Sequence, residues 1–243
     1  MSISIISDIH AAFYNPSGND ILSKFLKNKT VLKSNKIIFL GDIFDFMVGN
    51  YFEYLDMWNE FFSWIEKQQH KCEIHFVEGN HDFHLESLFN QKGFKINYHK
   101  EGFTLNVNNR ILYVEHGDDL EIDNNNYQRY KKIIRSNFVK KIANPKIIPF
   151  NLALKIGTSA SLRSRNIEEK YAKFTDDKLV KEKFRISFLK KCHKLNVQGI
   201  ICGHGHIKDY FESNGVFYAN NGYAPVSKTF IHYDQNELQF IEL

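Results

Sequence analysis

Short apolar runs that end in polar, chemically reactive residues are the feature that most constrains how this sequence can fold. Near-continuous runs of Ile, Val, Leu and Phe are typical of strands that are covered on both faces of a sheet. The chain is therefore predicted to be an α/β protein, with sheets packed together and helices outside them. The five predicted strands that precede polar motifs are Ile3–Ser7, Lys36–Leu40, Ile74–Glu78, Arg110–Glu115 and Gly199–Cys202.

The segments around these strands complete the expected architecture. Residues Asp20–Leu26 and Tyr54–Gln68 are predicted as helices, the second because its apolar side chains recur at helical spacing. Three further strands are expected near the end of the chain, where short alternating runs predict a β-meander. These strands span Val216–Asn220, Thr229–Tyr233 and Leu238–Ile241.

A polar motif follows each of the first five predicted strands. In open α/β sheets, ligand sites lie beyond the carboxyl ends of the strands. Five polar clusters at five strand ends are therefore expected to meet at one place. The motifs are Asp8-Ile9-His10, Gly41-Asp42-Ile43-Phe44-Asp45, Gly79-Asn80-His81-Asp82, His116-Gly117-Asp118 and Gly203-His204-Gly205-His206.

The residue types in these motifs indicate a metal centre. Imidazole together with carboxylate oxygen suits Mn, Fe, Zn or Co, whereas a structural zinc site usually needs Cys ligands. Asp8 and His10 are two residues apart, so on an extended strand both side chains would point the same way. A lone His116 is more often a structural histidine, but five such motifs together would leave many buried polar groups without partners.

A strongly basic stretch lies between two of these motifs. Residues 127–195 contain 19 Lys and Arg against 5 Asp and Glu, although the whole chain has a formal net charge of only +4. Their pattern is mostly helical and is interrupted by Pro145 and Pro149. We interpret residues 123–195 as a basic helical cap inserted into a core formed by residues 1–122 and 196–243. The charge indicates an anionic partner, with a solvated helical face as the open alternative.

Several features favour a cytoplasmic protein. The three cysteines include no closely spaced pair, so a disulfide framework is not expected. No run of 18 apolar residues predicts a transmembrane helix. The opening MSISIISDIH has neither a basic region nor a small-residue cleavage site, so no signal peptide is expected.

The order of motifs DxH, GDxxD, GNHD, H and GHxH resembles the signature of calcineurin-like metallophosphoesterases. Within that superfamily the sequence is most similar to bacterial UDP-2,3-diacylglucosamine diphosphatases of lipid A synthesis. This resemblance is carried by SDIH, GDIFDF, the run HGDDLEIDNNNYQRYKKIIRSN and the tail YANNGYAPVSKTFIHYD. It implies a four-layer αββα sandwich with a helical cap.

The resemblance also implies roles for individual residues. Asp45 and Asp82 would orient histidines or a turn, with ordinary helix or turn caps as the open alternative. His81, Asp42 and Asn80 would be catalytic, and the first metal would be held by Asp8, His10, Asp42 and His206. The second metal would be held by Asp42, Asn80, His116 and His204. Substrate contacts would come from Asn80, His81, Asp123, Tyr127, Arg163 and His204.

The implied reaction is hydrolysis of the diphosphate of UDP-2,3-diacylglucosamine to UMP and lipid X, with a metal-bridging hydroxide attacking phosphorus. We expect two divalent transition metals, Mn²⁺ in the first place, with Fe, Zn or Co able to use the same ligands. Peripheral association with the inner face of the cytoplasmic membrane is also expected. The alternative is a metallophosphoesterase that acts on a nucleotide, a phosphodiester or a phosphoprotein. A nucleic-acid-binding protein is not expected, because no nucleic-acid-binding motif is present.

Overall fold

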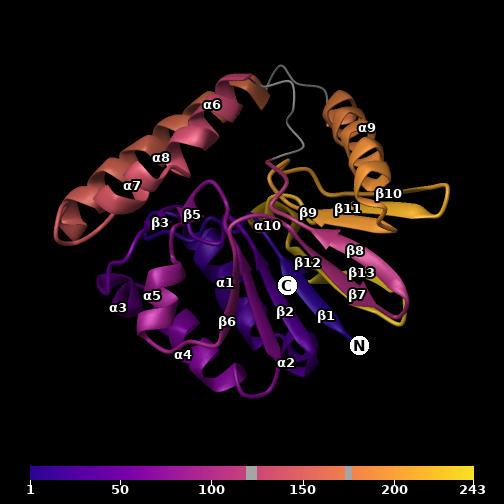
Figure 1. Ribbon diagram of the computed structural model, residues 1–243, viewed down its shortest axis with the longest axis horizontal. Helices are drawn as coiled ribbons and strands as arrows, with labels where there is room; N and C mark the ends of the chain where they lie inside the picture. The colour runs from indigo at the N-terminus through magenta and orange to yellow at the C-terminus, as the bar shows by residue number, and fades with distance from the viewer. Residues whose placement is uncertain (119–124, 173–176) are drawn as a thin grey trace.

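Two sheets form the centre of the molecule. The computed structural model describes residues 1–118, 125–172 and 177–243, and side chains within 1–118, 128–163 and 178–243 (Figure 1). The first sheet is mostly parallel, and the second contains three parallel strands between two antiparallel edge strands. The first has the order β13 (Glu237–Glu242), β12 (Thr229–Asp234), β1 (Ile3–Ile6), β2 (Lys36–Leu40), β4 (Glu73–Val77) and β6 (Ile96–His99). The second has the order β10 (Asp209–Ser213), β11 (Val216–Asn220), β9 (Gly199–Cys202), β8 (Arg110–Val114) and β7 (Phe103–Val107).

The strand β2 explains why the two sheets stack. Successive side chains of a strand point to opposite faces. Ile37 and Phe39 belong to the apolar cluster under the outer helices, whereas Ile38 and Leu40 belong to the cluster shared with the second sheet. A strand that is apolar on both faces must be covered on both, which places this sheet inside the molecule.

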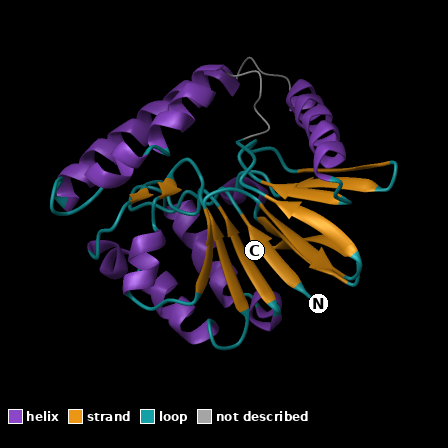
Figure 2. Cartoon of the chain, in the orientation of Figure 1, coloured by secondary structure: helices purple, strands orange, loops and turns teal. Residues whose placement is uncertain are grey.

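Helices cover the outer faces of both sheets (Figure 2). The apolar cluster on the first sheet includes Phe25 and Phe61 from two of its covering helices. The helix α9 (Asp177–Leu195) covers the second sheet through Phe188 and Cys192, which cluster with Ile200 and other strand residues. The predicted order of four layers, αββα, is thereby confirmed. The helices on the first side are α1 (Pro16–Lys27), α2 (Lys29–Lys33), α3 (Glu53–Met57), α4 (Asn59–Gln68) and α5 (Glu86–Gln91).

Three helices lie over the loops at one end of the first sheet, at the upper left of Figure 1. They are α6 (Asn125–Ile134), α7 (Asn137–Ile142) and α8 (Phe150–Ala172). The helix α9 comes from the same basic stretch but packs on β9 and β11. The proposed boundaries at residues 123 and 195 remain predictions.

Some predicted elements were wrong. The predicted helix Tyr54–Gln68 is two helices, α3 and α4, separated at Trp58, whose φ of −115° and ψ of 38° are not helical. The predicted β-meander does not form, because β11 pairs with β9 in the second sheet while β12 and β13 form a hairpin in the first. The strands β6, β7 and β10 were not predicted. Each is partly exposed and lies at a sheet edge, so its sequence lacks the continuous apolar pattern of an inner strand.

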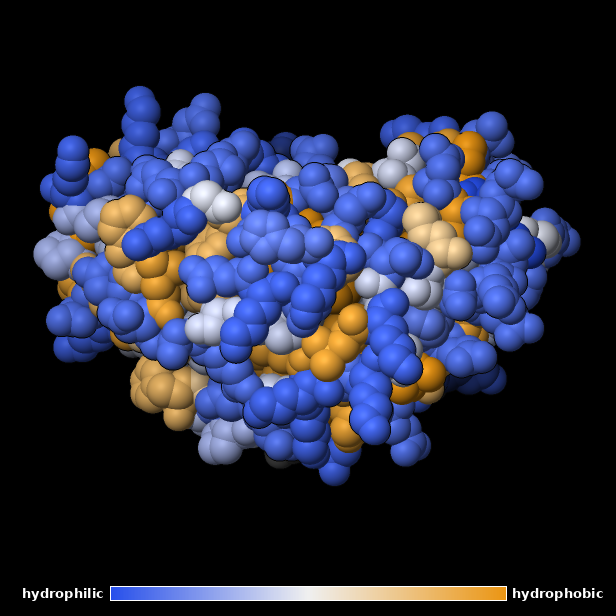
Figure 3. All heavy atoms as spheres, turned by 90° about the horizontal axis from the view of Figure 1, so that it is seen from below, coloured by the Kyte–Doolittle hydropathy of each residue, from blue (hydrophilic) through white to orange (hydrophobic). Residues whose placement is uncertain are grey.

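Two small elements lie among the loops that follow the strands. The paired strands β3 (Met47–Val48) and β5 (Asp82–Phe83) join the loops that follow β2 and β4. The short helix α10 (Ala224–Ser227) lies near α1. The molecular face shown in Figure 3 is mostly hydrophilic, with apolar residues in small groups. Among the described residues, every helix is too short or too polar to cross a bilayer.

Candidate metal centre

The predicted site residues follow five strands that end at one edge of the stacked sheets. From the first sheet, β1 leads to Asp8, β2 to Asp42 and β4 to Asn80. From the second, β8 leads to His116 and β9 to His204. Because the strands within each set are parallel, their carboxyl ends point to the same place.

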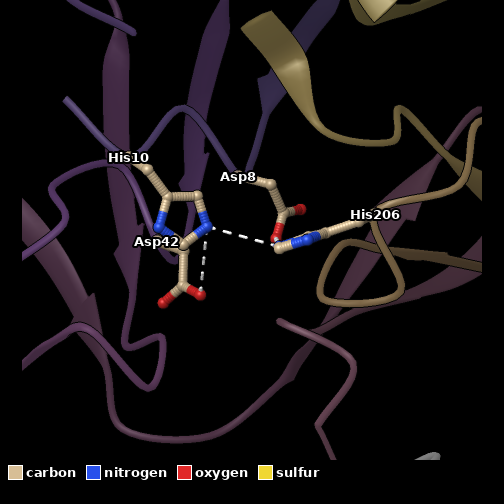
Figure 4. Close-up of side chains that lie close together, drawn as sticks. All are labelled: Asp8, His10, Asp42 and His206. Carbon is tan, nitrogen blue, oxygen red and sulfur yellow. Dashed lines mark hydrogen bonds and ion pairs between the residues drawn. The ribbon is translucent and has the colours of Figure 1, made fainter. Parts of the chain in front are cut away.

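One group of side chains comprises Asp8, His10, Asp42 and His206 (Figure 4). Each offers one ligand atom, and these atoms lie within 4.8 Å of one another. His10 Nε2 lies 3.3 Å from His206 Nε2 and 3.7 Å from Asp42 Oδ2. His206 Nε2 lies 3.4 Å from Asp8 Oδ1.

A second group contains Asp42 again, with His116 and His204, and its ligand atoms also lie within 4.8 Å of one another. His116 Nε2 lies 3.5 Å from Asp42 Oδ2. The Oδ1 atom of Asn80 lies 3.1 Å from His116 Nε2 and 3.2 Å from His204 Nδ1. Asp42 thus joins two groups that together contain six of the seven predicted ligands, and the seventh, Asn80, contacts both histidines of the second group.

The backbone at these residues differs from the predicted extended conformation. Asp8, His10, Asp42, His204 and His206 all have positive φ, between 50° and 64°. Only a few per cent of residues other than Gly adopt this region, in which Asp and His are enriched. The paired ligands therefore converge because the chain turns tightly after each strand, and the predicted alternation along an extended strand was wrong.

Asp45 and Asp82 support the two groups in different ways. Asp45 Oδ1 lies 3.2 Å from His10 Nδ1, so it orients a histidine. Asp82 accepts hydrogen bonds from the backbone N–H groups of Gly79, Asp42, Ile43 and Phe44, at 2.7 to 3.2 Å. Asp82 therefore fixes the turn that carries Asp42.

Glycine is required where the turns pass closest to the carboxylates. A Cβ atom on Gly79 would lie 2.2 Å from Asp42 Oδ1, and one on Gly203 would lie 2.3 Å from Asp8 Oδ2. Contacts this short do not occur between real atoms of these types. Any side chain at either position would displace a carboxylate of the first group.

The donor set fits divalent cations. His10 Nδ1 donates to the Asp45 carboxylate, which leaves the Nε2 lone pair facing the Nε2 atom of His206. Two imidazole nitrogens this close need a proton or a cation between them. Burial favours a raised pKa for Asp42, but the charges of His116 and His81 outweigh it and hold that pKa well below its usual range. An ionised buried carboxylate among imidazoles is a typical ligand set for Mn, Fe, Zn or Co.

The charge of the second group supports the same conclusion. Burial favours a lowered pKa for His116, but the neighbouring Asp42 carboxylate outweighs this and raises it to about 10. Without a metal ion the site therefore retains a proton as its positive charge. Metal binding is expected to release that proton, because a ligating histidine must be neutral. His116 Nδ1 donates to the carbonyl oxygen of Leu40 at 3.1 Å, so Nε2 is the nitrogen left for a ligand.

His81 lies beside both groups. Its backbone N–H donates to Asp42 Oδ1 at 2.9 Å, and its Nδ1 donates to the Asp45 carbonyl oxygen at 2.8 Å. Its ring meets that of His10 edge-on, with 4.8 Å between centroids. Its Nε2 is therefore the nitrogen that remains for a substrate.

Three further predicted substrate contacts, Asp123, Tyr127 and Arg163, come from the stretch interpreted as the cap. Arg163 is exposed on α8. Asp123 lies outside the described residues, and the side chain of Tyr127, at the start of α6, does so too.

Sequence reasoning missed several supporting side chains. Asn221 accepts hydrogen bonds from the Ser7 backbone N–H at 3.0 Å and hydroxyl at 2.8 Å, and donates to the Ser7 carbonyl oxygen at 3.2 Å. Asn220 donates to the Gly203 carbonyl oxygen at 2.7 Å. The signal was two consecutive polar amides at the end of a predicted strand, Asn220 as its last residue and Asn221 directly after it. Ser161, which donates to Asp45 from α8, had no such signal.

Comparisons with known proteins agree with this geometry. The profile of the family described as calcineurin-like phosphoesterase matches residues 1–208. A Neisseria meningitidis protein named UDP-2,3-diacylglucosamine hydrolase is 26% identical over 222 residues, covering 86% of this chain and 84% of that protein. Proteins with the same name from Proteus mirabilis and Wigglesworthia glossinidia brevipalpis are 26% and 28% identical. The Proteus match covers 85% of this chain and 82% of that protein, and the Wigglesworthia match covers 58% and 56%.

Solved structures with a similar course of the chain include an archaeal phosphodiesterase and Vps29 from Chaetomium thermophilum. The first is 14% identical with a TM-score of 0.46, over 100% of both chains. The second is 11% identical with a TM-score of 0.48, over 96% of this chain and 84% of that one. The family itself is established by the profile, which spans most of the sequence and contains every motif of the two ligand groups. The chain belongs to the calcineurin-like phosphoesterase family and is a metal-dependent phosphoesterase.

Proposed function

We propose that this chain is a dinuclear-metal hydrolase in which Asp42 is shared by two divalent ions. The observation that carries the proposal is the joining of two ligand groups through that one carboxylate. The first ion would be held by Asp8, His10, Asp42 and His206. The second would be held by Asp42, Asn80, His116 and His204.

The side chains around the groups have separate tasks in the proposed reaction. Two divalent ions, when bound, would supply an acidified water and hold the phosphoryl oxygens. Asn80 and His204 lie on the side of the second group and would contact the phosphoryl group. His81, whose Nδ1–H is held by the Asp45 carbonyl oxygen, would use Nε2 to protonate the leaving oxygen.

The proposed substrate is UDP-2,3-diacylglucosamine, cleaved at its diphosphate to UMP and lipid X. Support comes from the names of the similar proteins and from α6, α7 and the loop to α8, which combine basic residues with exposed apolar ones. Ile133, Phe138 and Ile147 are 62%, 70% and 59% exposed. Such a surface suits acyl chains or an anionic membrane. Asp123, Tyr127 and Arg163 are proposed contacts for the nucleotide sugar.

The substrate is tested by supplying purified protein and Mn²⁺ with UDP-2,3-diacylglucosamine and, separately, with bis(4-nitrophenyl) phosphate. We expect UMP release from the lipid-linked substrate at a far higher kcat/KM than hydrolysis of the generic diester. Equal or preferential turnover of the generic diester would favour the alternative specificity for a nucleotide, a phosphodiester or a phosphoprotein. Release of UDP instead of UMP would place the cleaved bond outside the diphosphate and contradict the proposal.

The metals and the location need their own tests. Reconstitution of metal-free protein with Mn²⁺, Fe²⁺, Zn²⁺ or Co²⁺ is expected to give the highest activity with Mn²⁺.

Sedimentation with phosphatidylglycerol vesicles tests the proposed peripheral association with the inner face of the cytoplasmic membrane, and phosphatidylcholine vesicles are the control. Phe138→Asp should weaken vesicle binding without changing hydrolysis of the soluble diester. Salt-sensitive binding of DNA or RNA in a filter assay would contradict the expectation that the protein has no nucleic-acid partner.

A further inference from the structure

The carboxylate of Asp45 lies between a proposed metal ligand and the helix α8. Asp45 Oδ1 accepts from His10 Nδ1 at 3.2 Å. Asp45 Oδ2 accepts from the hydroxyl of Ser161 at 2.7 Å, and the hydroxyl of Tyr14 donates to the same oxygen. Asp45 has no exposed surface and Ser161 is 5% exposed, so these contacts are removed from bulk solvent. The chain of contacts Ser161–Asp45–His10 connects residues that are far apart in the sequence.

The helix α8 is held against the core by more than this one hydrogen bond. The ring of Phe150, at its first residue, packs against Tyr51 and Tyr54, with 5.7 and 5.2 Å between centroids. Further along, a Cβ atom on Gly157 would lie 2.0 Å from the ring of Phe46. Phe150, Gly157 and Ser161 are spaced by seven and four residues, so they share one face of the helix.

This face of α8 docks onto the segment that carries Asp45. Its contacts with Phe46, Tyr51 and Tyr54 lie within ten residues of Asp45. The absence of a side chain at Gly157 permits the close approach that brings Ser161 to the carboxylate. A displacement of α8 would therefore remove one of the donors to the Asp45 carboxylate and hold it less firmly in the orientation that faces His10, although Tyr14 still donates to it.

We infer that Ser161 is a positioning residue, through which docking of α8 sets the orientation of His10. The inference rests on the proposed function, because it requires that Asp8, His10, Asp42 and His206 hold a metal ion. Mutation of a residue that orients a metal-ligating histidine commonly lowers metal affinity by about 10- to 100-fold. In the second group, His116 is oriented by the Leu40 carbonyl oxygen of β2, which belongs to the core. Loss of the α8 contact thus affects the two metal sites unequally.

The test compares Mn²⁺ binding to the wild-type protein, Ser161→Ala and Ser159→Ala by isothermal titration calorimetry of metal-free samples. Ser159 is the matched control because it is exposed on the same helix and its hydroxyl bonds only within it, to the Lys155 carbonyl oxygen. We expect two binding events in the wild type and in Ser159→Ala. In Ser161→Ala, one event should weaken by about 10- to 100-fold and the other should keep its affinity.

Two further variants separate positioning from a loss of folding. Ser161→Thr keeps a hydroxyl and should restore most of the lost affinity. Gly157→Ala keeps Ser161 but forces α8 away from Phe46, so it should weaken the same binding event. Circular dichroism would confirm that each variant is folded before titration.

The outcomes distinguish the inference from the function on which it rests. Unchanged affinities in folded Ser161→Ala, or equal weakening of both events, would overturn the positioning role. A wild-type protein that binds fewer than two Mn²⁺ ions would contradict the dinuclear function itself. Retention of two events with selective weakening in Ser161→Ala and Gly157→Ala supports both.

Discussion

Asp42 is the residue on which the two ligand groups depend. Its Oδ2 lies 3.7 Å from His10 Nε2 and 3.5 Å from His116 Nε2, so one oxygen faces both groups. Its own backbone is held at a φ of 54° by the carboxylate of Asp82. The turn that contains Asp42 and the turn that contains Asp82 are far apart in the sequence, and this hydrogen bond joins them.

Asp42→Ala is predicted to lose both metals and to reduce kcat by at least about 10³-fold. The reason is that one carboxylate serves both groups, and without it two sets of imidazoles would face each other with less negative charge between them. Metal analysis and steady-state kinetics of the purified variant provide the check. Asp56→Ala, at an exposed position on α3, is the control. A fully active Asp42→Ala protein would contradict the assignment.

His81→Ala is predicted to keep two metals while kcat falls by about 10²- to 10⁴-fold, the usual contribution of a general acid. The ring lies outside the two groups joined by Asp42, and its Nδ1–H is fixed by a backbone carbonyl. A leaving group of low pKa needs less protonation, so its hydrolysis should be less impaired than that of a poor leaving group. An equal loss for both leaving groups would argue for a role in binding only.

His75 makes stability depend on pH at a place away from the metal centre. It is buried, and its ring stacks on Phe103 with 5.0 Å between centroids. Burial, followed by the charges of His99 and Lys36, lowers the pKa of His75 to about 4. In the unfolded chain His75 binds a proton with a pKa of about 6.5. Between pH 6.5 and pH 4 the folded state therefore binds fewer protons than the unfolded state.

The free energy of unfolding should therefore fall as pH falls from about 6.5 to about 4, with a contribution from His75 of about 3 kcal/mol. Urea denaturation at a series of pH values gives this dependence. His75→Phe should flatten it, because the aromatic stack remains and the titrating group is gone. His70→Phe, at an exposed position, should leave the slope unchanged. An identical slope in His75→Phe would exclude His75 as the source.

At the scale of elements, the buried parallel strands could be predicted, whereas the edge strands β6, β7 and β10 could not. The predicted bounds of β2, β9 and β11 match the structure, because each is a short apolar run inside a sheet. The edge strand β10 carries exposed side chains such as Tyr210, so no continuous apolar run reveals it. The predicted meander failed because the parallel pairing of β11 with β9 depends on residues distant in the sequence.

The candidate site was predictable to a similar degree. Strand order and residue type placed the seven proposed ligands at one edge, since parallel strands bring their carboxyl ends together. The left-handed turns at Asp8 and His10 were not predicted, because local pattern does not fix a conformation that tertiary hydrogen bonds impose. The contacts of Ser161 and Asn221 join segments that only the folded chain brings together.

The helix α9 is predicted to stabilise the fold as its fourth layer. Phe188 has no exposed surface and its ring lies 5.4 Å from that of Tyr218. Phe188→Ala should lower the free energy of unfolding by about 3–5 kcal/mol, from lost burial and the cavity that remains. Ile186→Ala on the same helix should cost much less, because Ile186 is 53% exposed. Equal losses in chemical denaturation would contradict the layer assignment.

At the scale of the whole molecule, the two ligand groups draw their side chains from both sheets. Asp8 and Asp42 follow strands of the first sheet, whereas His116 and His204 follow strands of the second. Ions bound between them would oppose separation of the sheets. A ligand that binds only the folded state stabilises it in proportion to the logarithm of its concentration over Kd.

Removal of metal is therefore predicted to lower Tm. At an Mn²⁺ concentration 100 times Kd, each site should add about 2.7 kcal/mol to the free energy of unfolding. Differential scanning calorimetry with and without EDTA measures the effect, and return of Mn²⁺ should reverse it. Asp42→Ala should show no such shift. A wild-type Tm that does not change with EDTA or with added Mn²⁺ would exclude a role for metal in joining the sheets.

The most direct measurement of the central claim is anomalous X-ray scattering from crystals grown with Mn²⁺. The account predicts two manganese peaks per chain, about 3.5–4 Å apart, with the Asp42 carboxylate between them. One peak should be bound by Asp8, His10 and His206, and the other by Asn80, His116 and His204. A single peak, or two peaks that do not share Asp42, would contradict the dinuclear centre.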